Sequence, residues 1–136
     1  MSEKMVFVEQ ADVETQVFDW GRLSWLSEPR VTRVEKFSAG IVELELGKGH
    51  DRHNHPGCEE ILYVLEGTGQ QVVEVDGETV EREIGPGVLV HIPPDAFHST
   101  VNTGTGPMRI LAIYAPPGPE AELRALDGVT IEPPAR

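Results

Sequence analysis

Short stretches of alternating apolar and polar residues, separated by glycine and proline, run along most of this chain. Ile41–Leu46 reads IVELEL, and this alternation of apolar with acidic residues predicts a half-buried strand. Asp76-Gly77 separates two further stretches, which is a strong hairpin signal because both turn residues adopt positive φ. The same criteria predict strands at Glu60–Glu66, Val72–Val75, Thr79–Ile84, Val88–Ile92, Thr100–Val101 and Met108–Tyr114.

Many short strands without intervening helices predict an all-β sandwich or barrel. One short helix is expected at Glu120–Leu126, after the breaker PPGP, and the tail Glu132–Arg136 is expected to fray. Both tryptophans lie near the N-terminus, so that segment is expected to pack across the barrel or onto a second subunit. The predicted organisation is an N-terminal segment (1–30), a barrel (31–118) and a C-terminal helix and tail (119–136).

Length, charge and cysteine content narrow the classes of protein. A chain of 136 residues fits one domain, and no apolar run is long enough to span a membrane. The first residues do not follow the pattern of a signal peptide, so we expect the cytoplasm. A net charge of -12 disfavours nucleic acids and anionic membranes as partners. Cys58 is the only cysteine, so no disulfide forms within the chain.

Candidate metal ligands gather between Gly47 and Gly67. His53 and His55 are two residues apart, a spacing that places both imidazoles on one face of an extended strand. Imidazoles suit borderline metals such as zinc, iron, nickel or copper. Glu60 follows the turn at Pro56-Gly57, so its carboxylate can face the two histidines. Three groups alone would hold a metal loosely, and a further ligand is therefore expected from elsewhere in the chain.

His98 is the best candidate for that ligand. It follows Pro93-Pro94, a rigid turn that ends one predicted strand and directs the next. It lies within a second informative stretch, Gly87–Asn102, which reads GVLVHIPPDAFHSTVN.

These two stretches resemble the two signature motifs of the cupin superfamily. The first motif is glycine, five residues, His-x-His, three or four residues, Glu, six residues and glycine; the second is glycine, five residues, Pro-x-Gly, two residues, His, three residues and Asn. The chain matches the first motif throughout, and in the second it departs once, because Asp95 replaces the usual glycine. Asp tolerates left-handed turn geometry better than most residues. The matching residues are Gly47, His53, His55, Glu60, Gly67, Gly87, Pro93, His98 and Asn102.

The resemblance implies a small jelly-roll barrel, often a homodimer, with one metal held by His53, His55, Glu60 and His98 and with open positions for water. The metal is expected to be divalent Fe, Mn, Ni, Zn or Cu. The family includes dioxygenases, isomerases, lyases and cyclases, so we expect a metalloenzyme acting on a small oxygen-rich molecule, in which Glu60 either stays a ligand or moves a proton. The alternative is a non-catalytic module that binds or senses a small molecule.

Several other residues have a structural interpretation beside a functional one. Glu59 competes with Glu60 as the carboxylate ligand, but the spacing to Gly67 favours Glu60, and strand alternation turns Glu59 outward. Cys58 is expected to be a free turn thiol, His50 a loop residue at the barrel mouth and His91 a structural or surface residue. Arg33, Arg52 and Arg109 are expected to be exposed surface residues, and their alternative role is to anchor an anionic substrate. Tyr63 and Phe97 are expected to pack in the core or line a pocket. Leu62, Val64 and Val90 are expected in the core.

Overall fold

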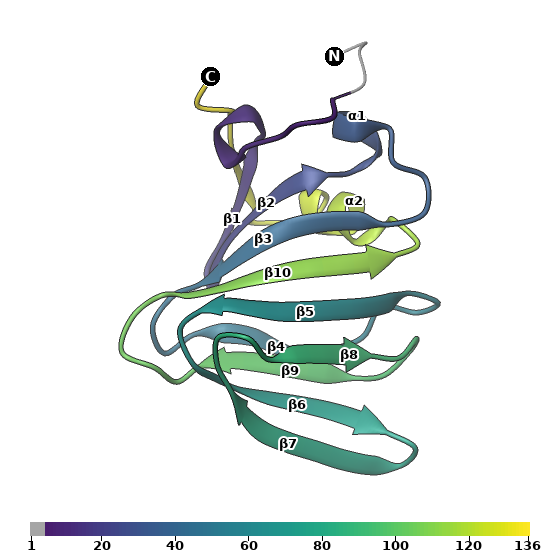
Figure 1. Cartoon of the computed structure of the whole chain (residues 1–136), viewed down its shortest axis with the longest axis vertical. Helices are drawn as coiled ribbons and strands as arrows, with labels where there is room; N and C mark the ends of the chain where they lie inside the picture. The colour runs from purple at the N-terminus through teal and green to yellow at the C-terminus, as the bar shows by residue number, and fades with distance from the viewer. Residues whose placement is uncertain (1–4) are drawn as a thin grey trace.

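The computed structural model describes residues 5–136, and it consists of two antiparallel β-sheets with a few short helical segments (Figure 1). The first four residues of the predicted N-terminal segment lie outside the described part. The seven-stranded sheet has the order β11-β1-β2-β3-β10-β5-β8 and the four-stranded sheet the order β4-β9-β6-β7. The strands are β1 (Thr15–Phe18), β2 (Gly21–Ser27), β3 (Ser38–Leu44), β4 (Gly49–His53), β5 (Glu59–Glu66), β6 (Gly69–Val75), β7 (Glu78–Ile84), β8 (Leu89–Ile92), β9 (His98–Asn102), β10 (Met108–Ala115) and β11 (Thr130–Glu132).

This architecture confirms the predicted all-β jelly roll. The hairpin at Asp76-Gly77 forms between β6 and β7, where Val75 pairs with Glu78. The expected C-terminal helix is α2 (Pro119–Arg124), which begins one residue earlier than predicted and ends two residues earlier. Two short helical elements were not anticipated, the one-turn helix α1 (Pro29–Thr32) and the 3-10 turn η1 (Gln10–Asp12).

The core lies between the two sheets. Its largest fully buried apolar side chains come from β2, β3, β5, β7, β8 and β10. Among the expected core residues, Leu62 and Val64 are buried and Val90 is half-buried. Along β10 every second residue is buried, as a strand with one face toward a core requires. The fully buried apolar side chains are Leu23, Trp25, Leu44, Val64, Ile84, Ile92, Met108 and Ile110.

The N-terminal residues extend the larger sheet, since β2 pairs with β3 and β1 pairs with β2. Trp25 is buried within its own chain, and its indole N–H donates to Gln16 Oε1 at 3.0 Å. The Gln16 amide in turn donates to the carbonyl of Glu120 in α2 at 3.1 Å. Trp25 is therefore unavailable as an anchor for a second subunit, and the expected homodimer stays a prediction.

The C-terminal tail does not fray, contrary to expectation. Strand β11 pairs with β1, and the backbone N–H of Arg136 donates to the carbonyl of Ala11. The Arg136 guanidinium also pairs with Glu9 and Asp12. Sequence reasoning missed these contacts because they join residues more than a hundred positions apart.

Candidate metal centre

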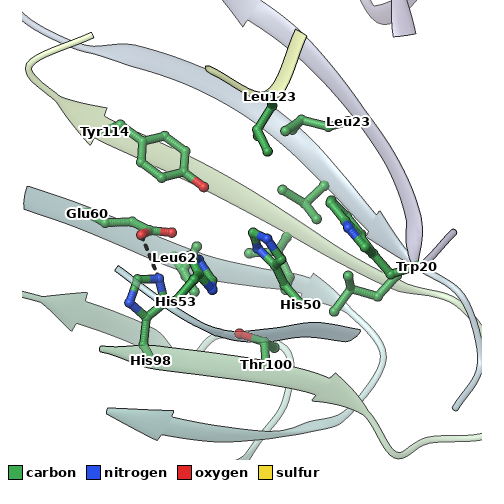
Figure 2. Close-up of a pocket in the computed structure, with 13 residues that line it drawn as sticks. Trp20, Leu23, His50, His53, Glu60, Leu62, His98, Thr100, Tyr114 and Leu123 are labelled. Atoms are coloured by element: carbon green, nitrogen blue, oxygen red, sulfur yellow. Dashed lines mark ion pairs between the residues drawn. The ribbon is translucent and has the colours of Figure 1, made fainter. Parts of the chain in front are cut away.

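Three of the four predicted ligands, His53, Glu60 and His98, come from strands of the two sheets and point into the space between them (Figure 2). The fourth, His55, lies in the loop between β4 and β5. In the smaller sheet, His53 at the end of β4 pairs in register with His98 at the start of β9. In the larger sheet, Glu60 on β5 pairs in register with Tyr114 on β10. Residues directly opposite each other on neighbouring strands share one face of a sheet. Each sheet therefore presents a pair of polar side chains to the other.

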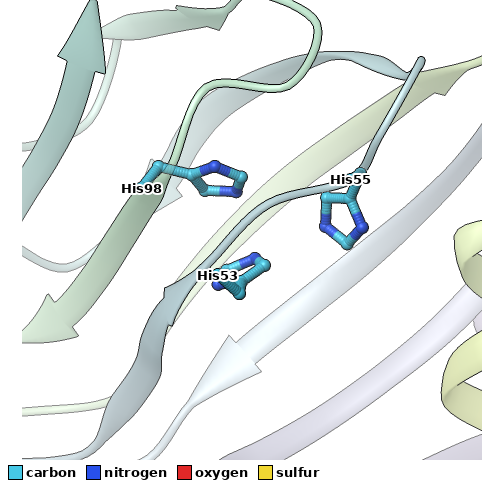
Figure 3. Close-up of side chains that lie close together, drawn as sticks. All are labelled: His53, His55 and His98. Carbon is cyan, nitrogen blue, oxygen red and sulfur yellow. The ribbon is translucent and has the colours of Figure 1, made fainter. Parts of the chain in front are cut away.

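The three histidines form a tight cluster (Figure 3). One ring nitrogen from each of His53, His55 and His98 lies within 4.8 Å of the other two. Glu60 joins the cluster, because its Oε1 lies 3.1 Å from His98 Nε2 and 3.8 Å from His55 Nε2. The structure thus brings together all four residues that the spacing singled out, and a three-histidine cluster of this kind suggests a metal site.

Backbone carbonyls orient two of the imidazoles. His53 Nδ1 lies 2.6 Å from the carbonyl oxygen of Asp51, and His98 Nδ1 lies 3.0 Å from that of Ala96. A carbonyl can only accept a hydrogen bond, so each Nδ1 carries the proton and donates. The lone pair of each ring is then on Nε2, which is the tautomer that a metal ligand needs.

Several polar atoms in the cluster are buried and make no well-formed hydrogen bond among the described residues, although two of them, Glu60 Oε1 and His98 Nε2, face each other as an ion pair at 3.1 Å. They are both ring nitrogens of His55, Glu60 Oε1 and His98 Nε2. Buried polar atoms in folded proteins nearly always have a partner, because an unsatisfied group costs about 1–3 kcal/mol. Two imidazoles and a carboxylate that converge in this way are the donor set that divalent transition metals accept.

Burial favours the neutral, ligand form of two of the three histidines. Burial, followed by the neighbouring His98, lowers the pKa of His53 to about 4, and burial likewise lowers the pKa of His55. Burial opposes protonation of His98 too, but contact with the Glu60 carboxylate outweighs it, so the pKa of His98 is raised. Burial and then the charge of Glu60 raise the pKa of Tyr114 well above its ordinary value, so its hydroxyl stays protonated.

A small pocket opens beside the cluster, with about 30 Å³ open to the centres of water-sized molecules. A volume of roughly 10–15 Å³ measured in this way holds one water, so the enclosed part of the pocket takes a few waters or the reacting end of a compact ligand. His53, Glu60 and His98 line it, together with residues that the sequence analysis did not assign to a site, Trp20, Leu23, His50, Thr100, Tyr114 and Leu123 among them.

The expected position of His50 at a loop surface is wrong. His50 lies in β4 opposite Thr100. Its ring stacks on Trp20 at 5.0 Å and lies tilted against His53 at 3.7 Å between centroids. Strict alternation would turn His50 and His53 to opposite faces, but the pairing of β4 with β9 shifts register between them. The extra residue of this β-bulge returns both rings to the inner face. Burial, followed by the neighbouring imidazoles, lowers the pKa of His50 to about 3.

Tyr114 could have been found from its own strand. Met108, Ile110 and Ala112 alternate with more polar or exposed positions along β10, and Tyr114 continues the inward series. No alternation along a strand points to Trp20 or Leu123. They reach the pocket because the N- and C-terminal segments pack onto the larger sheet.

The candidate anion-binding arginines do not reach the cluster. Arg52 pairs with Glu74 and lies over the ring of Phe97, 3.9 Å from its centroid, on the outer side of the smaller sheet. Arg109 donates to Gln10, and Arg33 ends α1. Phe97 and Tyr63 are both partly exposed and lie outside the pocket lining.

Three neighbours of the motif keep their structural interpretations. Glu59 faces outward and pairs with His91, at about half exposure for both side chains. Cys58 is a free thiol whose sulfur faces the carbonyls of Glu59 and Pro116. Burial raises the pKa of Cys58 to about 11, so it is a thiol and not a thiolate.

Asp95, which replaces the glycine of the second motif, has a structural role of its own. Its φ of 69° lies in the left-handed region that the glycine would supply. Its Oδ1 accepts a hydrogen bond from the backbone N–H of Gly57 at 2.8 Å, and its carbonyl accepts from the Asn54 amide at 3.1 Å. Asp95 thereby fixes the loop that carries His55.

Comparison with known proteins agrees with the fold and the cluster. The chain matches the Cupin domain over residues 40–114. It is 43% identical over 68 residues to glucose-6-phosphate isomerase of Thermococcus kodakarensis, which is 49% of this chain but only 35% of that enzyme. The chain thus spans about a third of the length of this relative. Among the described residues, no helix is long and apolar enough to cross a membrane.

Solved structures give the same result. The oxalate decarboxylase of Lactobacillus farciminis, in complex with formate, superposes with a TM-score of 0.72 at 27% identity, over 79% of this chain and 32% of that chain. KdgF from Halomonas superposes with a TM-score of 0.72 over 87% of this chain and 99% of that chain, and its 18% identity shows the fold alone. With the domain match spanning more than half of its length, this chain belongs to the cupin family.

Proposed function

We propose that this protein is a metalloenzyme that holds one divalent transition metal with His53, His55, Glu60 and His98 and acts on a small oxygen-rich molecule. The observation that carries the proposal is the convergence of three buried or half-buried histidines and a buried carboxylate, with both ring nitrogens of His55 making no hydrogen bond among the described residues. Leaving such atoms without partners would be unfavourable, and a shared cation satisfies several of them together.

The surrounding residues suit acid–base chemistry on an oxygen-bearing ligand. A divalent metal in this position would supply Lewis acidity toward a carbonyl, carboxylate or hydroxyl oxygen. The Tyr114 hydroxyl stays protonated and faces the same space, so it can donate a hydrogen bond to that oxygen. Glu60 is the carboxylate placed to hold a proton taken from the ligand. Leu23 and Leu123 border the pocket and limit the entry of water.

The relatives support the substrate class and not a particular reaction. A glucose-6-phosphate isomerase and an oxalate decarboxylase both act, by their names, on small oxygen-rich molecules. Each aligns with this chain over about a third of its own length. Isomerase, lyase, cyclase and dioxygenase chemistry all stay within the proposal, as does the identity of the metal among Fe, Mn, Ni, Zn and Cu.

Metal analysis of protein purified without a histidine tag tests the first half of the proposal. We expect about one transition metal per chain, because residues 5–136 contain one such cluster. His55→Ala should lose the metal, whereas His91→Ala, which removes an exposed histidine outside the cluster, should retain it. Full metal content in the His55→Ala variant would contradict the proposed ligand set.

Turnover tests the second half. Metal-loaded protein is incubated with hydroxy acids, diketones and sugar acids, with and without oxygen, and the products are followed by NMR. We expect turnover of at least one compound by the wild type and by His91→Ala, and none by His55→Ala. Binding without turnover across the panel would instead favour the non-catalytic binding module.

A further inference from the structure

The pocket beside the cluster carries no fixed positive charge. Of the residues that line it in the described part of the chain, none is an arginine or a lysine. One wall is apolar, and the polar lining residues outside the ligand set are His50, Thr100 and Tyr114, with the indole of Trp20 at the mouth. The apolar wall consists of Leu23, Val42, Leu44, Leu62, Ile110 and Leu123.

The cations nearest to the motif in sequence are committed elsewhere. Lys48 donates to the carbonyl of Asp19, and Arg52 makes two hydrogen bonds to Glu74 on the outer side of the sheet. At the other end of the pocket, Arg124 follows Leu123 but pairs with Glu14 and Glu28. None of these guanidinium or ammonium groups is placed to meet an anionic group of a ligand in the pocket.

This charge arrangement restricts the ligand. A divalent metal with one glutamate ligand leaves a single formal positive charge, which one carboxylate of a ligand neutralises. A phosphate dianion added to that ligand would enter a mostly apolar space without a cation, and burying an unpaired charge is strongly unfavourable. Sites that recognise phosphate normally supply arginine, lysine or a helix N-terminus.

Two polar groups in the pocket can bind an uncharged oxygen of the ligand. His50 and Thr100 are directly opposite each other in the β4–β9 pairing. The Thr100 hydroxyl donates to Gln71 Oε1, which leaves its oxygen free to accept. His50 is held by stacking on Trp20 and by tilted contact with His53, and among the described hydrogen bonds none uses its ring nitrogens. An imidazole held this way can both donate to and accept from a hydroxyl group.

We propose that the pocket selects a compact, unphosphorylated hydroxycarboxylate, with its carboxylate end at the histidine cluster and a second, uncharged oxygen hydrogen-bonded to His50. The inference rests on the proposed function, because it requires the metal. It separates this protein from the sugar-phosphate isomerase that it resembles over half of its chain.

A matched pair of probes tests the exclusion of phosphate. Glycerate and 3-phosphoglycerate share a carboxylate and its neighbouring hydroxyl, and they differ in whether the far hydroxyl carries phosphate. Calorimetric titration and thermal unfolding of the metal-loaded full chain should show binding of glycerate, and 3-phosphoglycerate should bind at least about tenfold more weakly. Equal or tighter binding of 3-phosphoglycerate, or no binding of glycerate, would overturn the inference.

A second comparison tests His50 itself. Glycolate lacks the far hydroxymethyl group, so it should bind wild type and His50→Phe equally, while His50→Phe should bind glycerate about threefold to tenfold more weakly than wild type, the value of one or two hydrogen bonds. Phe keeps an aromatic ring in the stack, and His50→Gln, which restores a donor and an acceptor, should recover part of the glycerate affinity. His91→Phe is the matched control on the outer face. Unchanged glycerate affinity in His50→Phe would overturn the role of His50.

Metal content, measured on each variant before titration, separates this inference from the function on which it rests. Wild-type protein without metal would mean that the proposed function fails. Wild-type protein that holds its metal but does not distinguish the two glycerates would mean that only the inference about the pocket fails.

Discussion

Strand β5 carries two adjacent glutamates, each beside a histidine, on opposite faces of the larger sheet. Glu59 lies outside, with its Oε2 2.5 Å from His91 Nε2 and both side chains about half exposed, at 52% and 51%. Glu60 lies inside, with its Oε1 3.1 Å from His98 Nε2 and both side chains almost fully buried, at 4% and 3%. Two adjacent glutamates, each paired with a histidine, therefore occupy entirely different environments.

The difference shows that burial, and not residue type, makes the inner pair a candidate centre. Water screens the outer pair, and exposed ion pairs of this kind contribute little to stability. The inner pair has neighbours that complete a donor set, since His53 and His55 lie within reach of His98 and Tyr114 lies opposite Glu60. Low dielectric strengthens every electrostatic interaction there, so the effects of substitution should be large inside and small outside.

Replacing the two glutamates in turn gives the largest expected contrast. Glu60→Gln keeps the size of the side chain but removes the charge, so metal affinity should fall by at least about a hundredfold, because even indirect partners of metal ligands are worth 10–100-fold. Glu59→Gln should leave the affinity unchanged. Competition of each purified variant against a chromophoric chelator measures both values.

Similar metal affinities for Glu60→Gln and Glu59→Gln would contradict the assignment of different roles to the buried and the exposed glutamate. If Glu59→Gln alone weakened binding, the ligand would be the other carboxylate, the alternative that the sequence spacing disfavoured. Thermal unfolding of the metal-free proteins is the control, because both variants should unfold as cooperatively as the wild type.

Local pattern was enough to predict most of the fold and the inner cluster. The strands of the barrel follow from alternation. Among the candidate ligands, His53, His55 and Glu60 were selected by their local spacing, and His98 by its place after Pro93-Pro94 and in the second cupin motif. Glu60 was chosen over Glu59 because of its spacing to Gly67, and the two-residue period of a strand then turned Glu59 to the opposite face. These are short-range properties, and the sequence carries them directly.

The parts that escaped prediction depend on irregularity or on long-range packing. His50 was misplaced because the β-bulge between it and His53 breaks the period. Trp20 and Leu123 come to the pocket from the two ends of the chain, through pairing of β2 with β3 and docking of α2. Trp25 suggested an interface by its size, yet its indole N–H finds a partner, Gln16, within the same chain.

The same contrast between a buried and an exposed ion pair can be tested for stability, with Arg124–Glu28 as the buried pair and Arg52–Glu74 as the exposed one. Arg124 of α2 lies 2.6 Å from Glu28, which is almost fully buried, and 2.9 Å from Glu14. Burial raises the pKa of Glu28 against the opposing effect of Arg124, so the carboxylate depends on this partner for its charge. Arg124→Ala leaves that carboxylate buried and unpaired, which should lower the free energy of unfolding by about 3 kcal/mol.

Urea denaturation of the metal-free protein measures this effect. Arg52→Ala is the outer control, because it removes an exposed partner of Glu74 and should change the unfolding midpoint little. Equal losses in the two variants would mean that burial does not decide the strength of these pairs. A loss in Arg124→Ala that shrinks at low pH, where Glu28 takes up a proton, would identify the unpaired carboxylate as its cause.

A third comparison concerns the pH dependence of stability in metal-free protein. Burial lowers the pKa of His50 to about 3 and that of His53 to about 4, and it lowers the pKa of His55, while an unfolded histidine titrates near 6.5. As pH falls from about 6.5 toward 4, the unfolded chain therefore takes up protons that these folded imidazoles refuse, and the protein loses stability. The raised pKa of His98 acts in the opposite direction, since the folded state holds that proton more tightly.

Three histidines with a lowered pKa against one with a raised pKa predict that the free energy of unfolding falls as the pH falls. Each proton that is taken up only on unfolding contributes up to about 1.4 kcal/mol per pH unit to this loss. His50→Phe removes the most strongly lowered group, so its stability should fall less steeply between pH 6.5 and 4 than that of wild type. His91→Phe, which changes an exposed ring on the outer face, should follow the wild-type slope. Urea midpoints measured across this range in the presence of a chelator supply the test, and parallel curves for wild type and His50→Phe would mean that the inner imidazoles are not held neutral by burial.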